Sequence, residues 1–256
     1  MRSARGVLLT SLLGVLPQAG LAACSSPSSA PTDTNMNAGT GGTAATESGN
    51  ATSIARVSAT DEVLGVGVVI PVKSFENVPS TDPAFQNNVG LEMSDTVRDR
   101  TFIQLLRINW LSGGHGPAPY GKPHFDLHFY RGTKDEVTAI DCDTTDPFSA
   151  DILASGYEPP STCVRGMGYH AWPSEDIANH TFSASIILGY ANQEMVFIEP
   201  MITQELLLSR QSFELDITRP ASAGGAPTLY PTHMTATYSA MSDTYTFEFN
   251  EFAMID

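Results

Sequence analysis

The chain has 256 residues, of which 28 are acidic and 13 are basic, and its formal net charge at pH 7 is −15. A surface with so large an acidic excess repels phosphate backbones and anionic lipid headgroups, so we expect no nucleic-acid partner. We interpret the charge as a source of solubility.

The first 23 residues have the features of an export signal. Arg2 and Arg5 precede an apolar stretch from Val7 to Leu16, which is too short to cross a bilayer as a helix. With the following Leu21-Ala22-Ala23-Cys24, this N-terminus resembles a bacterial lipoprotein signal peptide. The resemblance implies cleavage before Cys24, acylation of that cysteine and a lipid anchor in the membrane. Because Ser25 is not acidic, we expect the outer membrane or cell surface of the bacterial envelope.

Residues 24–58 consist mostly of Ser, Thr, Ala, Gly and Asn, with almost no large apolar side chains. Such a composition cannot bury enough surface to offset the loss of chain entropy. We therefore predict a flexible linker that begins at the acylated Cys24. Residues 59–256 are then predicted to form a single β-rich domain, which is long enough for a sizeable core.

Alternation of apolar and polar residues recurs through this domain and is typical of strands with one buried face. It predicts an all-β fold, an antiparallel sandwich or barrel with one short helix. Residues 191–194 are short enough for a hairpin loop, and the good helix formers of residues 201–209 predict the helix. The predicted strands are Val63–Val72, Phe102–Trp110, His124–Arg131, Phe182–Tyr190, Met195–Glu199, Phe213–Thr218, Met234–Ala240 and Tyr245–Phe252.

The most informative of these strands is the one that begins at His124. Its alternation places His124, Asp126 and His128 on one face and three apolar residues on the other. Exposed strand faces usually carry Thr, Lys, Glu or Arg, so a row of two imidazoles and a carboxylate indicates a functional site. The pattern locates that site without naming a reaction.

The cysteines that remain after Cys24 are Cys142 and Cys163. An even pair in an oxidising compartment predicts a disulfide bond that holds an irregular segment still. Two reduced thiols or a thiolate metal site are the alternatives, and the second lacks the Cys-x-x-Cys spacing of zinc sites.

Several short motifs follow one another along the chain: Trp110, Gly114-His115, Pro119-Tyr120, Pro123 to Tyr130, Gly166 to His170 and Val196 to Thr203. Their order resembles that of a family of secreted bacterial proteins of unknown function, the DUF5602 or TTHB-type proteins. The sequence departs from that pattern at Leu127, where Phe is expected, and at Ala171-Trp172. The resemblance implies a secreted β-rich domain and self-association into a homo-oligomer, gives Glu199 its weight as a site residue, and implies no activity.

The sharpest hypothesis is a site for a divalent metal ion, because imidazole and carboxylate groups are ligands that Zn, Fe and Mn use. Strand residues two apart are separated by about 7 Å and those four apart by about 13 Å, so both histidines of the strand reach one ion only at a bulge or bend. The predicted metal residues are His124, Asp126, His128, His170 and Glu199, with His115 and Tyr130 at the rim of the pocket.

Within this set we predict that His128 or His124 joins His170 and Glu199. Asp126 then either coordinates the ion or orients an imidazole by a hydrogen bond. The alternative is a buried hydrogen-bond network in which the strand pins the loop of residues 113–119.

The predicted function is therefore that of an envelope lipoprotein that binds a metal ion or a small ligand. The chain has no Gly-x-Ser-x-Gly, His-Glu-x-x-His or phosphate-loop motif. A metal-dependent hydrolase or lyase, with Glu199 or Asp126 as the general base beside a metal-bound water, is the second hypothesis. A non-catalytic envelope protein that self-associates through its sheets is the third.

Overall fold

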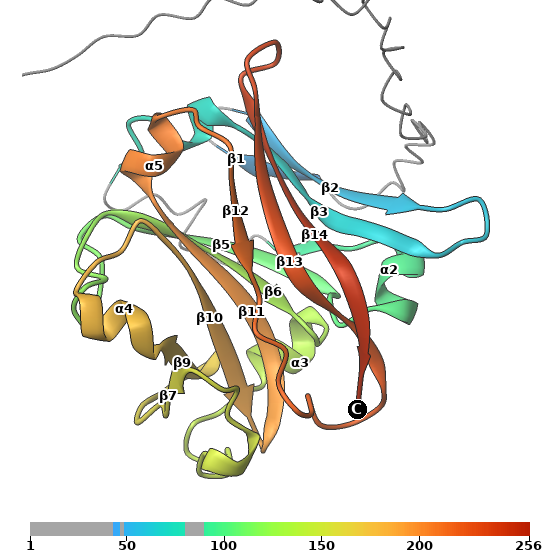
Figure 1. The fold of residues 1–256 in the computed structure, drawn as a ribbon, viewed down its shortest axis with the longest axis vertical. Coiled ribbons are helices and arrows are strands. Elements are labelled where there is room, and N and C mark those ends of the chain that lie inside the picture. The colour runs from blue at the N-terminus through green and yellow to red at the C-terminus, as the bar shows by residue number, and fades with distance from the viewer. Residues whose placement is uncertain (1–42, 47–48, 80–89) are drawn as a thin grey trace, which may run out of the picture. The chain divides into compact units, whose positions relative to one another are not determined.

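The computed structural model describes residues 43–46, 49–79 and 90–256, with side chains from residue 51 onward. The predicted signal peptide, Cys24 and the linker up to residue 42 lie outside these described residues. The described chain folds into two antiparallel sheets of six and eight strands with four short α-helices (Figure 1). The predicted all-β class is confirmed, and of the two predicted architectures the structure has the sandwich.

The six-stranded sheet has the order β1-β2-β3-β14-β13-β12. Its last two long strands form a hairpin that runs the length of the sheet in Figure 1. The strands are β1 (Thr43–Thr46), β2 (Gly49–Val57), β3 (Val63–Pro71), β12 (Phe213–Asp216), β13 (Thr228–Ser239) and β14 (Thr244–Ile255).

The eight-stranded sheet has the order β4-β5-β6-β11-β10-β9-β7, and β8 pairs with β9 beside it. Strand β6, which carries the His/Asp row, lies between β5 and β11 in the middle of this sheet. The strands are β4 (Gly90–Glu92), β5 (Leu105–Leu111), β6 (His124–Tyr130), β7 (Tyr157–Glu158), β8 (Cys163–Val164), β9 (Gly168–Pro173), β10 (Ala184–Ala191) and β11 (Glu194–Thr203).

The predicted helix is present as α5, although it is shorter than expected because β11 continues to Thr203. The Thr203 hydroxyl then accepts a hydrogen bond from the Leu206 N–H and caps the helix. Three further α-helices were not predicted. The helices are α2 (Asp95–Arg100), α3 (Lys134–Thr138), α4 (Ser174–Asn179) and α5 (Gln204–Leu208), with 3-10 helices η1 (Val72–Phe75) and η2 (Ala150–Ile152).

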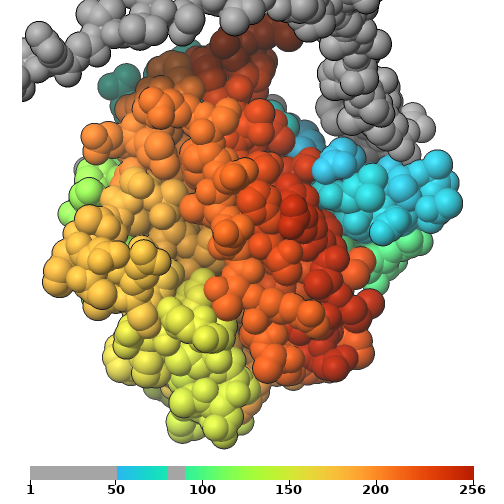
Figure 2. Space-filling view, in the orientation of Figure 1, coloured from blue at the N-terminus to red at the C-terminus, as the bar shows by residue number. Residues whose placement is uncertain are grey.

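The main core lies between the two sheets. The Phe129 ring of β6 packs edge-on against Phe249 of β14 with centroids 4.6 Å apart. Phe75 contacts Phe125 at 4.9 Å and Phe247 at 6.3 Å, so it joins both layers. Each of these fully buried rings contributes roughly 1.5–3 kcal/mol relative to exposure. In the space-filling view the orange-to-red C-terminal segments lie against the gold segment that contains β10 (Figure 2).

The outer face of the eight-stranded sheet is also covered. A second apolar cluster there includes Tyr130, Phe197 and Met201 of the sheet together with Tyr120 and Val137 of the covering segments. Every residue of β6 is therefore buried, whichever face it points to. This cover turns the outer face into the wall of a pocket.

The predicted hairpin is confirmed and is tight. Tyr190 pairs with Met195 and Ala191 with Glu194, which leaves Asn192 and Gln193 as a two-residue loop. Both loop residues have positive φ, as a hairpin turn that matches the twist of its strands requires.

The boundary predicted at residue 59 is too late for the sheet. Strand β2 lies within the expected linker, pairs with β3 and buries Ala51 completely. The small and polar side chains of β2 give no strand pattern in the sequence, because backbone pairing to β3 needs no large apolar residue at each position.

Among the described residues, every helix is too short or too polar to span a membrane.

Candidate functional site

The alternation of apolar and polar residues along β6 places them on two different faces of the sheet, as predicted. Phe125, Leu127 and Phe129 enter the core between the sheets, and the polar residues of β6 point to the outer face. His124, Asp126 and His128 are nevertheless 4% exposed or less. Burial of charged or polar groups at this level is costly unless they are paired, so the row needs partners on the same face.

The first group of partners comes from β9 and β11. Glu199 of β11 presents its carboxylate to His128, with Oε1 at 3.3 Å from His128 Nε2, and to His170, with Oε2 at 3.9 Å from His170 Nε2. Potential ligand atoms of the three residues lie within 4.8 Å of one another. We call this set, His128, His170 and Glu199, the Glu199 cluster.

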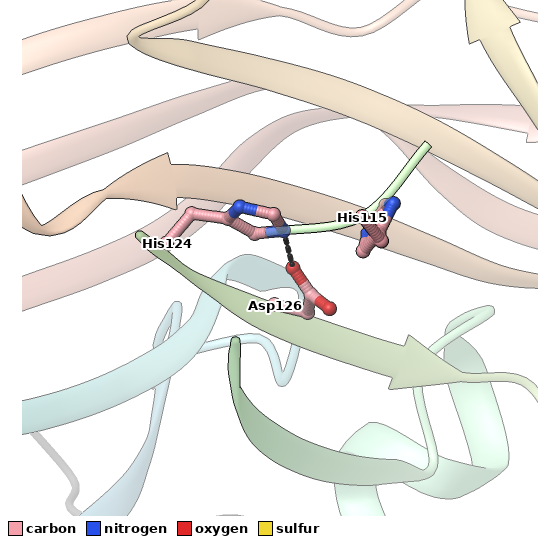
Figure 3. A group of neighbouring side chains, drawn as sticks. All are labelled: His115, His124 and Asp126. Carbon is pink, nitrogen blue, oxygen red and sulfur yellow. Dashed lines mark ion pairs between the residues drawn. The ribbon is translucent and has the colours of Figure 1, made fainter. Parts of the chain in front are cut away.

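The second group of partners includes a loop residue. His115, from the loop between β5 and β6, joins His124 and Asp126, and potential ligand atoms of these three also lie within 4.8 Å of one another. Figure 3 shows the His115 ring approaching the His124–Asp126 pair from a separate segment. The His124 Nε2 to Asp126 Oδ1 distance is 3.1 Å. We call this set, His115, His124 and Asp126, the Asp126 cluster.

Burial dominates the electrostatics of the Glu199 cluster. It lowers the pKa of His170 to about 4, with a smaller contribution from His115, and lowers the pKa of His128 well below its usual range. Burial raises the pKa of Glu199 well above its usual range, and the nearby Asp126 raises it further. Neutral imidazoles are the form that binds metal ions, whereas a carboxyl ligand must lose its proton to do so.

Every residue of the two clusters except His124 lines one pocket, which has a volume of about 660 Å³. This places the two groups in a shared space open to a small molecule. The lining residues are Asn109, Leu111, His115, Gly116, Pro117, Asp126, His128, Ser161, Thr162, Val164, Met167, His170, Trp172 and Glu199.

A disulfide bond fastens the wall of the pocket formed by the β8 segment. Cys142 and Cys163 form the predicted disulfide, with their Cα atoms 5.7 Å apart. Pocket residues flank Cys163 on both sides, from Ser161 to Met167. A backbone hydrogen bond of 2.8 Å from Gly166 N to Ile140 O ties the same segment to the end of α3. The disulfide therefore holds one side of the pocket against the segment that follows α3.

The loop that carries His115 depends on Gly114. Its φ is +64°, and a Cβ at this position would lie 2.2 Å from Tyr120 O and 2.6 Å from Lys122 N. Only glycine fits such a close approach at positive φ. A backbone hydrogen bond of 3.1 Å from His115 N to Tyr120 O then fixes the start of the loop over the pocket.

Buried polar atoms without a hydrogen bond are concentrated at this pocket. In most proteins such atoms are rare, and each costs about 1–3 kcal/mol unless an ion, a water or a ligand satisfies it. A site that binds something polar accounts for their occurrence together. In the described residues they include Asn109 Oδ1, His124 Nε2, Asp126 Oδ1, both ring nitrogens of His128, and Glu199 Oε2.

The structure brings together all five predicted metal residues, but it divides them between two clusters. His115, predicted at the rim, lies within reach of a shared ion with His124 and Asp126. Tyr130, also predicted at the rim, is fully buried and does not line the pocket. Its ring instead stacks on His128, with centroids 5.6 Å apart and an interplanar angle of 8°. Tyr130 belongs to the packing beneath the site because the covering segments close over this end of β6.

Sequence reasoning missed Arg107 and Asn109 of β5. They pair with His128 and Asp126 across the strands, so they share the outer face. Arg107 is 3% exposed and donates to the Thr138 hydroxyl at 2.9 Å. The polar alternation of these two residues within an apolar strand is the signal that marks them.

Comparison of the chain with protein-family models, with curated proteins and with solved structures returned no match. The family resemblance described above therefore stays a prediction.

Proposed function

We propose that this protein is a lipid-anchored envelope protein whose β domain binds a divalent metal ion through His128, His170 and Glu199. The observation that carries the proposal is the convergence of two imidazole Nε2 atoms on the two oxygens of one buried carboxylate, at 3.3 and 3.9 Å, with no hydrogen bond to His128 Nε2 or Glu199 Oε2.

The spacing favours a shared ion over direct hydrogen bonds. With metal–ligand bonds of about 2.0–2.2 Å, neighbouring ligand atoms in one shell lie roughly 3.0–3.5 Å apart. The 3.3 Å separation of His128 Nε2 and Glu199 Oε1 falls in that range, and the 3.9 Å separation of His170 Nε2 and Glu199 Oε2 exceeds it by a few tenths of an ångström. A bound divalent cation would also favour the ionised form of Glu199, which burial alone opposes.

The donor set indicates which ions fit. Two imidazoles and one carboxylate are typical of Zn²⁺ sites with an open position and of Fe²⁺ sites, and Mn²⁺ also accepts such ligands. Three protein ligands leave coordination positions that a water or small molecule could fill from the pocket. The pocket volume of about 660 Å³ is within the range of small-molecule sites.

This open pocket is the specific observation that favours a second candidate function, a metal-dependent hydrolase or lyase. An ion with an open position can activate a water, and Asp126 lies on the same face of β6 as His128 as a candidate general base. Turnover on a substrate panel would separate this enzyme from a binding protein.

Metal analysis of the full-length protein, purified without a polyhistidine tag, tests the proposal. After chelation and reconstitution with Zn²⁺, the parent is expected to retain bound zinc after gel filtration, and His128→Ala is expected to lose the ion held by the Glu199 cluster. His180→Asn is the matched control, because His180 is exposed, lies outside both clusters, and has a positive φ that Asn tolerates. Absence of zinc from the folded parent, or equal zinc in parent and His128→Ala, would overturn the proposal.

A further inference from the structure

We infer that the same pocket holds a second divalent cation, bound by His115, His124 and Asp126. The inference rests on the proposed function, since it adds a second ion beside the one held by the Glu199 cluster. It is carried by the geometry of a different set of side chains, whose ligand atoms come within 4.8 Å of one another.

His124 and Asp126 are the two buried residues of this set. His124 Nδ1 lies 2.7 Å from the carbonyl oxygen of Lys122, so this nitrogen carries the proton and donates it. In the neutral ring His124 Nε2 is then an acceptor, and it lies 3.1 Å from a second acceptor, Asp126 Oδ1, with no hydrogen bond to either atom. Two acceptors held this close in a buried site repel each other unless a cation lies between them.

A proton on His124 Nε2 does not satisfy this pair. The two atoms are close enough for a hydrogen bond, yet their directions do not meet the requirements for one. The side chains of His124 and Asp126 are also only 0% and 6% exposed, so water cannot freely solvate them. Two ligands of one metal ion, in contrast, stand about 3.0–3.5 Å apart with their lone pairs directed at the ion.

The third ligand, His115, has the same arrangement as His124. Its Nδ1 lies 2.8 Å from the carbonyl oxygen of Gly116, so in the neutral imidazole Nδ1 carries the proton and Nε2 is the nitrogen that can coordinate. The His115 and His124 rings meet edge to face with centroids 4.8 Å apart. Metal-bound histidines commonly donate their second ring nitrogen to a backbone carbonyl, because this fixes both the tautomer and the ring orientation.

The position of β6 explains why the two ions would share one pocket. Asp126 and His128 are two residues apart on the same face, so neighbouring positions of one strand supply a ligand to each cluster. Residues of both clusters line the same cavity. Because His115 is half-buried and comes from a loop, its ordering costs binding energy, and we expect the second site to fill after the first.

Metal stoichiometry tests the inference. The chelated full-length protein is titrated with Zn²⁺, and the zinc retained after gel filtration is counted by mass spectrometry of the eluted protein. The parent is expected to bind two ions per chain in two steps. His115→Ala, a change at a half-buried loop residue, is expected to bind one. His180→Asn is expected to bind two.

The outcomes separate this inference from the proposed function. One ion in the parent that is lost in His128→Ala but kept in His115→Ala would leave the proposed function standing and overturn the second site. Two ions in both the parent and His115→Ala would show that the second ion lies elsewhere. No ion in the folded parent would overturn both. His124→Gln, with circular dichroism to establish folding, provides a second variant that is expected to bind one ion.

Discussion

Glu199 is the residue whose protonation depends most strongly on what occupies the pocket. Its side chain is 1% exposed, and its close neighbours in the Glu199 cluster are two histidines whose pKa values burial lowers. In the metal-free protein these surroundings favour a protonated carboxyl. A divalent cation reverses that preference, because it supplies the positive charge that the imidazoles do not.

Glu199→Gln should therefore have opposite effects on stability and on metal binding. Because the pKa of Glu199 is raised, the folded protein keeps its carboxyl proton at pH values above the unfolded pKa of about 4.3. The contribution of this protonation to the stability of the fold is therefore complete below that pH. It is lost as pH rises through the folded pKa. At pH 7 the metal-free variant should unfold at higher urea concentration than the parent, with the difference smallest at pH 4, while zinc affinity falls by more than about 100-fold.

Urea unfolding at pH 4 and pH 7 with chelator present, together with zinc titration, measures both effects. A metal-free parent more stable than Glu199→Gln at pH 7 would contradict the account, because it would mean that the buried carboxylate is stabilised by groups of the protein itself.

Several of these residues could be recognised from the sequence because a strand places alternate side chains on one face. That rule was sufficient for His124, Asp126 and His128. It could not say that His115 joins His124 while His170 joins His128, because those contacts depend on a loop and on β9, which lie far away in the chain. Tyr130 was placed wrongly for the same reason: its exposure is decided by the segments that cover the end of β6.

At the scale of elements, β11 and β9 bring Glu199 and His170 beside the polar residues of β6, and β10 lies between these two strands in the same sheet. Gly189 of β10 pairs with His170, and the Phe197 ring of β11 lies over the space that a side chain at 189 would fill. The same ring contacts His128 at 5.0 Å and His170 at 4.9 Å between centroids. Phe197 thereby sets the separation of the two imidazoles, and Gly189 makes room for it.

Gly189→Ala should disturb the Glu199 cluster without changing any of its members. A Cβ at this position would lie 2.0 Å from a Phe197 ring carbon, so the ring that contacts both histidines must shift. We expect destabilisation of roughly 1–3 kcal/mol, which is typical of overpacking, and weaker zinc binding. Chemical denaturation and zinc titration measure the two effects.

Gly121→Ala is the matched control for Gly189→Ala. A Cβ at residue 121 would meet nothing within 4 Å, and the backbone there is not in the left-handed region. It should leave both stability and zinc affinity close to the parent values. Equal behaviour of the two alanine variants would argue against a positioning role for Phe197.

The elements themselves were predicted unevenly from the sequence. Strands with a clear apolar line, such as β6, β10 and β14, were found with small errors at their ends. The pattern predicts a strand that ends at Glu199, yet β11 continues through Pro200 in its pairing with β10, and its pairing with β6 is interrupted at residues 199 and 200. β2 was missed because its composition is that of a linker, and tertiary pairing with β3 overrides composition.

At the scale of the whole molecule, the two faces of the eight-stranded sheet have separate tasks. The inner face packs on the six-stranded sheet and stabilises the fold, whereas the covered outer face holds the pocket. The proposed membrane attachment is made by the acylated Cys24, which lies outside the described residues.

The proposed lipid anchor can be tested, because the acidic protein has no electrostatic attraction to the membrane that would replace it. Cleavage before Cys24 would remove Arg2 and Arg5 and leave 11 basic against 28 acidic residues, a net charge of −17 that anionic headgroups repel. Acyl chains, at about 0.8 kcal/mol per buried CH₂, would have to supply the binding energy. In a bacterial host the parent should sediment with membranes through a high-salt wash and be released by detergent, with an intact mass raised by the lipid. Cys24→Ser should lose that added mass and Ser25→Ala should keep it, while a soluble parent with an unmodified Cys24 would refute the anchor.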